Sequence, residues 1–423
     1  MIMNLPPFTP APGVEKPLLP AGAQLIFSQS RNLERQGAVA SKVTLQWEMA
    51  GPLNETAMCR AMDTLAQAKD YLHLELENGE DGGIIKDSTP KPAQVEHILS
   101  QDLAAEMEAW STRSPHPGTP ACALRLLKIE QQRYALGLSG PHDILDIWTI
   151  DQTLATLAQL YNQIIDQESV HLSQGPDFKD FSAWYDSLLA SGHLEQSRAF
   201  WQQLLDGTSP VFTSPPAPGT SDHPLKTVQS FLPLDPDLCR KFEAKTRALG
   251  ASVFEGYFTL YNFALSRISG KNNLLTAFVA SLRRMPGLKD VEGCMLNRFY
   301  IPVRLTDSND YPSVLNKVSQ TLASAKQHCL WPTWKELDPE CAGYPGLFFH
   351  YVPPDKGSRP EFKHLSVSRF KTVTPAFWPH PMSFQVTGDP TQPSLFAIGQ
   401  SGFCSKAWLE ELQKTFVSVM TEI

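Results

Sequence analysis

The chain has 423 residues, of which 42% are hydrophobic and 19% are charged, and its formal net charge is −8. This is ordinary globular composition, and the length is sufficient for two packed lobes with buried cores. An acidic chain lacks the basic face that binds a phosphate backbone, so we expect no nucleic-acid partner. No apolar run approaches the ~18 residues of a membrane span, and the start of the chain has no secretory signal pattern. We therefore expect a cytoplasmic protein without membrane contact.

The seven cysteines are scattered along the chain and form no CxxC pair. Their odd number and spacing predict neither a disulfide framework nor a zinc site, so we expect no bound metal. We interpret them as small buried residues of a reducing compartment, which agrees with the cytoplasm.

The first 140 residues alternate between strand and helix patterns. Val43 to Met49 and Tyr71 to Glu77 alternate apolar with polar residues, as half-buried strands do, and Leu53 to Ala68 has helical spacing. Ala123 to Ile129 and Tyr134 to Leu138 predict two adjacent strands joined by a short turn.

A loop over Ser139 to Asp143 follows these strands, and a long helix follows the loop over about Asp146 to Gln163. His142 is therefore placed where a strand passes into a helix, and two rigid neighbours make this a common position for a functional side chain. Helices over Phe181 to Gly207 come next. The proline-rich stretch from Ser209 to Pro224 has no periodicity, and we interpret it as a linker between two lobes.

The second half begins with helix signals. Asp235 and Pro236 form an N-cap and first turn, and Ser252 to Glu255 is a capping box for a helix that runs to Ile268. The remaining predicted elements are strands at Leu274 to Ala280, Met295 to Val303, Leu347 to Val352, Leu365 to Phe370 and Leu395 to Gly399, and helices near 311–328 and 406–420. Each half thus mixes a sheet with helices, which predicts an α/β protein of two lobes.

Most catalytic motifs are missing from the sequence, including the Walker A loop, GxGxxG, GxSxG and HExxH. We therefore expect no directly bound cofactor. The remaining candidate is the run from Pro141 to Thr149, which contains His142 and Asp146 in an HxxxD spacing. Chance supplies roughly half such a match per chain, and a loop histidine followed by an N-cap aspartate would also explain it.

This run resembles the HHxxxDG motif of condensation domains from nonribosomal peptide synthetases, in which a Trp-Ser pair often follows. His142 matches the second histidine, Asp146 the aspartate, and Trp148 with Thr149 the trailing pair. Two positions depart from the motif, because Pro141 replaces the first histidine and Ile147 replaces the glycine.

Four further segments are similar to the family in the same order, over about 190 residues in all. They are Asp180 to Trp184 (YxDYAxW), His193 to Gly207 (the helix that follows it), Arg283 to Pro286 with Gly293 to Asn297 (the stretch ending in GxFVNT), and His328 to Pro332 (HQDxPF). The arginine-rich motif that the family has early in the chain is not recognisable near residues 68–76.

The resemblance implies a two-lobed sandwich like chloramphenicol acetyltransferase, in the V-shaped arrangement of condensation domains. It predicts an N-terminal lobe over residues 1–185 that carries the HxxxD motif and a C-terminal lobe over 186–423, with a substrate tunnel between the lobes.

The resemblance also implies acyl transfer in the biosynthesis of a nonribosomal peptide or polyketide. An acyl thioester on the phosphopantetheine arm of a carrier protein would be joined to a small-molecule amine or hydroxyl acceptor. His142 would act as the base or would orient the attacking group, because a neutral imidazole with a pKa near 6.5 can accept a proton. Asp143 beside it would favour the protonated ring if its side chain faced the imidazole.

Other site residues follow from the same resemblance. Asp146 is implied to pair with Arg283 and to pin the motif loop to the other lobe. Asp143, Trp148, Asn297 and Trp331 are candidate tunnel residues, although packing explains the two tryptophans better. Asn297 has two open interpretations, a hydrogen bond near the tunnel or a turn at a strand end, and His350 has no supporting motif.

Two alternatives to a condensing acyltransferase stay open. The chain could be a silent relative that docks a carrier protein or partner enzyme, which Pro141 and Ile147 favour, or its tunnel could catalyse an isomerisation or cyclisation. We expect a monomer that acts in trans, and an excised domain of a larger synthetase is the other interpretation.

Overall fold

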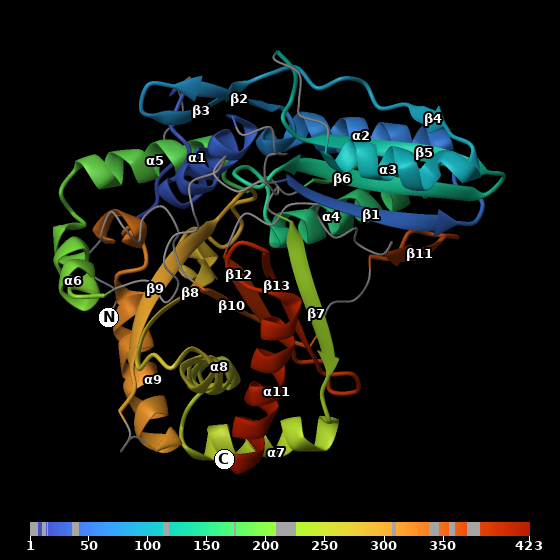
Figure 1. Ribbon diagram of the computed structural model, residues 1–423. Coiled ribbons are helices and arrows are strands. Elements are labelled where there is room, and N and C mark those ends of the chain that lie inside the picture. Colours follow the sequence, from blue (N-terminus) through green and yellow to red (C-terminus); the bar gives the residue numbers. More distant parts are fainter. Residues whose placement is uncertain are drawn as a thin grey trace.

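Two β-sheets organise the chain, one in each of two lobes that lie one above the other in Figure 1. The computed structural model describes residues 7–10, 14, 16–35, 42–112, 118–172, 175–208, 226–306, 310–337, 347–354, 360–369 and 381–423. Within these residues, no helix has the length and apolar character needed to cross a membrane. The fold is a mixed α/β sandwich, as the sequence predicts.

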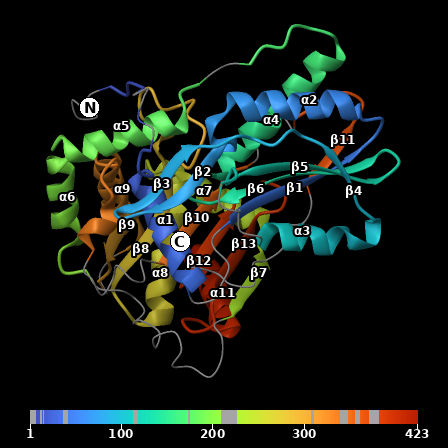
Figure 2. The same cartoon turned by 90° about the horizontal axis from the view of Figure 1, so that it is seen from above.

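The upper lobe contains a five-stranded sheet with helices on both faces. Its strands, in spatial order, are β11 (Ser366–Arg369), β1 (Lys42–Ala50), β6 (Arg133–Pro141), β5 (Ala123–Glu130) and β4 (Val95–His97). Helices α2 (Glu55–Ala68) and α4 (Ile147–Ile165) lie on one side of the sheet and α3 (Leu103–Thr112) on the other, as Figure 2 shows. A small hairpin of β2 (Leu74–Gly79) and β3 (Gly82–Asp87) lies above them.

The lower lobe contains a six-stranded sheet packed against helices. In spatial order the strands are β7 (Thr227–Pro233), β13 (Ser394–Gln400), β12 (Met382–Thr387), β10 (Leu347–Val352), β8 (Asn273–Ser281) and β9 (Leu296–Arg304). The helices are α7 (Pro236–Ala248), α8 (Val253–Ser269), α9 (Tyr311–Gln327) and α11 (Lys406–Glu422). Phe254 and Phe258 of α8 contact Phe349 of β10, so alternate β10 side chains face the helices and the others, Phe348 and His350, face the opposite side.

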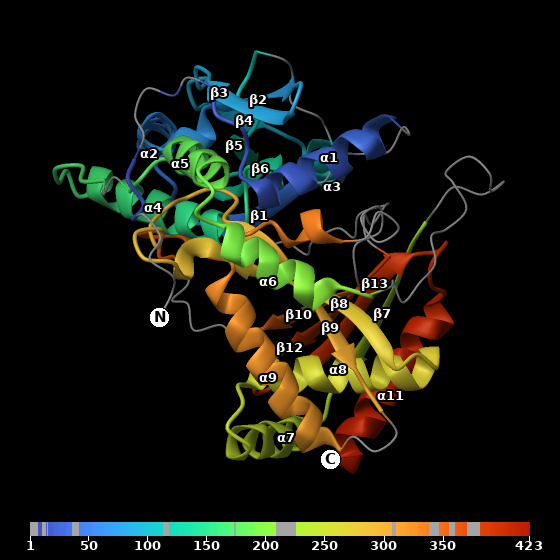
Figure 3. The same cartoon turned by 90° about the vertical axis from the view of Figure 1, so that its left-hand side faces the viewer.

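Several segments join the two lobes. Helices α5 (Phe178–Ala190) and α6 (Glu195–Leu205) run from the upper lobe down the side of the lower one, as Figure 3 shows. Strand β11 comes from the second half of the chain but pairs antiparallel with β1 of the upper sheet. The boundary at residue 185 stays a prediction, and β11 shows that the chain crosses back to the upper lobe after it.

Most predicted elements are confirmed within two or three residues of their expected ends, including the capping box at Ser252. Two boundaries differ from the expectation. The strand expected from Tyr71 begins only at Leu74, because Tyr71 lies in a short 3-10 turn and its buried hydroxyl bonds Thr153. The loop expected from Ser139 is strand as far as Pro141, because these residues pair with β1. The linker expected over 209–224 lies outside the described residues.

Helix α1 (Ala21–Arg35), which the periodicity does not predict, contacts both lobes. Its second residue, Gly22, lies so close to β9 that a Cβ atom there would be 2.1 Å from the carbonyl oxygen of Leu296. Only a residue without a side chain allows this approach.

We expect Gly22→Ala to destabilise the protein although alanine is the better helix former. The helical gain is at most about 1 kcal/mol, whereas forcing a packed interface apart costs about 1–3 kcal/mol. Urea unfolding measures the difference, with exposed Ser28→Ala on the same helix as the control, for which a change within about 0.5 kcal/mol is expected. A Gly22→Ala protein as stable as the control would contradict this close contact.

Candidate active site

The turn that carries His142 is held by backbone hydrogen bonds at its base. Strand β6 ends at Pro141, whose carbonyl oxygen accepts hydrogen bonds from the amides of Ile144 and Leu145, each at 3.0 Å. Helix α4 begins two residues later, with Asp146 as its N-cap. His142 is thus fixed between a strand and a helix.

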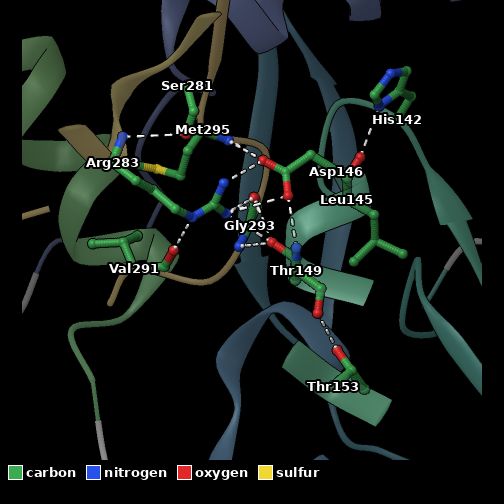
Figure 4. A network of polar contacts seen from close by, with 10 residues as sticks. All are labelled: His142, Leu145, Asp146, Thr149, Thr153, Ser281, Arg283, Val291, Gly293 and Met295. Atoms are coloured by element: carbon green, nitrogen blue, oxygen red, sulfur yellow. Dashed lines mark hydrogen bonds and ion pairs between the residues drawn. The ribbon is translucent and has the colours of Figure 1, made fainter. Parts of the chain in front are cut away.

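The His142 ring has a defined tautomer. Its Nδ1 lies 2.7 Å from the carbonyl oxygen of Leu145, and a carbonyl only accepts, so Nδ1 carries the proton. In the neutral ring Nε2 then keeps its lone pair. Figure 4 shows the ring beside this carbonyl and apart from the ion-pair network.

Burial lowers the pKa of His142 below its ordinary value of 6.5, and the positive charge of Arg298 acts in the same direction. The hydrogen bond to Leu145 and the charge of Asp146 oppose this change but do not reverse it. The ring is therefore neutral at pH 7, and the protonated form that a facing Asp143 would favour does not prevail. Asp143 is itself buried, and its charge adds to the burial that raises the pKa of the Cys122 thiol.

Asp146 joins the two lobes through one buried carboxylate. It caps α4 by accepting the Thr149 amide at 2.8 Å, and it receives the Arg283 Nη1 at 2.6 Å and the Met295 amide at 3.1 Å. Asp146 and Arg283 are 2% and 8% exposed. The ion pair that the resemblance implies between them is present, and Figure 4 shows it at the centre of a polar network.

The Arg283 guanidinium donates to this network from each of its nitrogens. Besides Asp146 it donates to the carbonyl oxygens of Val291 and Gly293 and to the Thr149 hydroxyl, at 2.7–2.9 Å. Its carbon lies 4.0 Å from the centre of the Trp148 ring. These hydrogen bonds help to offset the desolvation penalty that a buried ion pair carries.

Thr149 is a member of this network to which the motif comparison assigned no role. Its hydroxyl donates to the Gly293 carbonyl at 2.8 Å and accepts the Gly293 amide at 2.9 Å. One small hydroxyl on α4 thereby holds the backbone of the opposite lobe. The threonine in the trailing pair of the motif was the only signal for it.

The other candidate tunnel residues make structural contacts. Trp148 is 37% exposed and stacks on Arg283, whereas Trp331 is buried and its Nε1 donates to Glu336 at 3.0 Å. The side-chain nitrogen of Asn297 donates to the carbonyls of Cys329 and Trp331, at 2.8 and 3.0 Å. Asn297 therefore ties the segment similar to HQDxPF to β9. Contact of these residues with a substrate stays a prediction.

His350 and Arg298 lie near His142, and no signal in the sequence pointed to either of them. Burial lowers the pKa of His350 to about 4, and the positive charge of Arg298 and the nearby His142 ring, when protonated, act in the same direction. His350 lies on β10 and Arg298 on β9, so three segments distant in sequence meet here. Within the described residues, no group of three or more histidine, cysteine or acidic side chains is placed to hold a metal ion.

Comparison with known families explains this arrangement. The model of the condensation domain matches residues 23–333, about three quarters of the chain. The chain belongs to the condensation-domain family. A curated relative, chondramide synthase cmdD of Chondromyces crocatus, is 24% identical over 323 residues, which are 72% of this chain and 8% of that synthase. The chain thus spans less than a tenth of that relative's length.

Solved structures of the family share the fold. In the complex of the X-domain and OxyB from teicoplanin biosynthesis, the match has a TM-score of 0.84 at 15% identity and covers 100% of this chain and 96% of that one. VibH, a condensation enzyme of nonribosomal peptide synthesis, matches with a TM-score of 0.73 at 16% identity over 95% of both chains. At such identities these matches show the two-lobed fold alone.

We expect Asp146→Asn to cost about 3–5 kcal/mol of stability. Asparagine still caps a helix, so the loss reports the uncompensated Arg283 charge rather than the cap. Urea unfolding measures it, with Asp166→Asn as the matched control, because Asp166 pairs with Lys363 at the surface, where about 0–1 kcal/mol is expected. Equal losses in the two variants would show that the buried pair does not hold the lobes.

Proposed function

We propose that this protein is an acyltransferase that joins a carrier-protein-bound acyl thioester to an amine or hydroxyl acceptor, with His142 as the base. The observation that carries the proposal is the His142 ring itself. Its proton is held on Nδ1 by Leu145, burial keeps it neutral, and Nε2 has a lone pair to receive a proton.

The proposed reaction balances on this one residue. The acceptor nitrogen or oxygen attacks the thioester carbonyl carbon and gives its proton to Nε2 of His142. Collapse of the tetrahedral intermediate breaks the carbon–sulfur bond, and the leaving thiolate of the phosphopantetheine arm takes the proton back. His142 ends neutral, and binding both substrates in one orientation contributes to the rate alongside the base.

The two departures from the family motif are compatible with this role. Pro141 supplies its carbonyl to the turn, and a backbone carbonyl does not depend on the side chain of the residue. Ile147 is 48% exposed at the start of α4, so its side chain extends into solvent rather than crowding the backbone of the turn.

The proposed partners follow from the family. Relatives such as chondramide synthase are large synthetases, so we infer that a carrier protein delivers the acyl group on its phosphopantetheine arm and that the acceptor is a small molecule. A tunnel between the lobes, a cytoplasmic location and a monomeric state are parts of the same proposal.

A docking protein is the second candidate. One structural neighbour, the X-domain, was solved in complex with OxyB, which is a precedent for a partner protein on this fold. Loss of the first histidine of the motif to Pro141 agrees with this candidate. The complete Asp146–Arg283 network and the prepared His142 favour the enzyme.

We expect His142→Ala to abolish the product that depends on this protein. Loss of a positioned base lowers rates by about 10²–10⁴-fold. Metabolite profiles of the host are compared for the wild type, the His142→Ala variant and a full deletion, with protein levels checked. His193→Ala is the control, because His193 is an exposed histidine in the turn between α5 and α6.

The point variant and the deletion should lose the same compound, and the missing compound names the bond formed. If His142→Ala keeps the compound that the deletion loses, the docking protein is the better account.

A further inference from the structure

Arg298 is a buried cation without an acidic partner in the part of the chain that the structure describes. It is 5% exposed, and no carboxylate of the described residues lies within ion-pair distance of it. Among the described residues, its guanidinium donates from Nη1 to the neutral amide oxygen of Gln29 on α1, at 3.0 Å. The Tyr300 hydroxyl also lies beside it, and this group is neutral because burial raises its pKa to about 12. Arg283, which is also buried, has a carboxylate and three further acceptors.

The Arg298 side chain lies across the face of the lower sheet that points away from its helices. Arg298 is paired with Val279 of β8, and its guanidinium carbon is 5.3 Å from the centre of the Phe348 ring on β10, one strand further on. Small Ala277, which is paired with Phe348, leaves room for this reach. Phe348 stacks on His350, with ring centres 6.0 Å apart.

These neighbours do not compensate the charge. Phe348 offers only the face of its ring, and His350 and His142 are neutral or positive, never negative. Arg298 lowers the pKa of both histidines, which places all three groups within electrostatic reach of one another. A charge removed from water without an anion is costly, and proteins retain such a charge where a ligand supplies the counter-ion.

We propose that Arg298 binds a carboxylate of the substrate next to His142. Guanidinium is suited to this task, because its planar donors match the two oxygens of a carboxylate. Gln29 fixes the orientation of the guanidinium from one side and Phe348 from its face. This inference rests on the proposed function, because it takes the carboxylate to belong to a substrate of the acyl transfer.

The carboxylate can come from either partner of that reaction. An acceptor that is a free amino acid or hydroxy acid carries one, and so does an acyl group derived from a dicarboxylic acid. Arg298 would bind either carboxylate in the same way. The experiment below distinguishes the acceptor from the acyl donor as its source.

Carboxylate binding at Arg298 can be tested without an enzyme assay, by measuring the Tm of the full chain in the presence of small carboxylates. The probes are acetate, benzoate and N-acetylglycine, each compared with its neutral amide at equal ionic strength. We expect at least one carboxylate to raise the Tm of the wild type above its amide, by about 1–2 °C at a tenfold excess over its Kd. The Arg298→Met variant should lose this difference, and Arg304→Gln, an exposed arginine on the same strand, should keep it.

Stability without any probe gives a second readout. The unpaired charge predicts that Arg298→Met unfolds at the same or a higher temperature than the wild type. Arg298→Gln serves if the methionine variant does not fold. The inference is overturned if no carboxylate exceeds its amide in the wild type, if the difference survives in both Arg298 variants, or if both variants lose as much stability as Asp146→Asn.

The product identifies the source of the carboxylate. In the host, the compound lost with His142→Ala should carry a free carboxylate, next to the new bond if the acceptor supplies it and on the acyl chain if the donor does. A product without a carboxylate would contradict the inference and leave the acyltransferase proposal intact. If carboxylates raise the Tm but the His142→Ala variant keeps the product, the carboxylate site is supported and the acyltransferase proposal is contradicted.

Discussion

The ion pair between Asp146 and Arg283 is the contact on which the rest of the site depends. One carboxylate caps α4, receives the amide of Met295 and neutralises an arginine of the opposite lobe. The same residue ends the turn that presents His142, so the position of the imidazole and the junction of the lobes are fixed together. Because the pair is buried, removal of either partner would leave the other charge uncompensated, so the role expected of Asp146 is to stabilise the fold.

The tautomer and the protonation state of the imidazole are set by a backbone carbonyl, by burial and by Arg298. The Leu145 carbonyl selects the tautomer, and burial together with Arg298 disfavours the charged form. A partner carboxylate of the kind that raises the pKa of a histidine would act against a base that must be neutral. The motif position occupied by Pro141 contributes a carbonyl to the turn, so the first histidine of the family motif is not needed to hold His142 in place.

Much of this could be predicted from local sequence, and the rest depends on contacts between distant segments. Alternation indicates β1, a continuous apolar run indicates the buried strand β8, and a capping box indicates the start of α8. His142, Asp146 and Arg283 were found through resemblance, since no spacing rule connects residues 137 positions apart. The pairing of β11 with β1 joins segments more than 300 residues apart, so it leaves no local pattern. The meeting of Arg298, His350 and His142 leaves none either, because each residue comes from a different segment of the chain. Helix α1 was missed for a related reason, since Gly22 is unfavourable in an isolated helix and is required only by its approach to β9.

The central claim, that His142 is a neutral base with its proton on Nδ1, is tested most directly by ¹⁵N chemical shifts of the histidine rings. The protein is labelled at histidine, and His142 is assigned by comparison with His142→Ala. Because burial lowers its pKa below the ordinary value of 6.5, the midpoint of the ring's protonation should lie below pH 6.5. Over the neutral range, Nδ1 should show the shift of a protonated nitrogen and Nε2 that of an unprotonated one. A proton on Nε2, or a midpoint above pH 6.5, would contradict this account of the site.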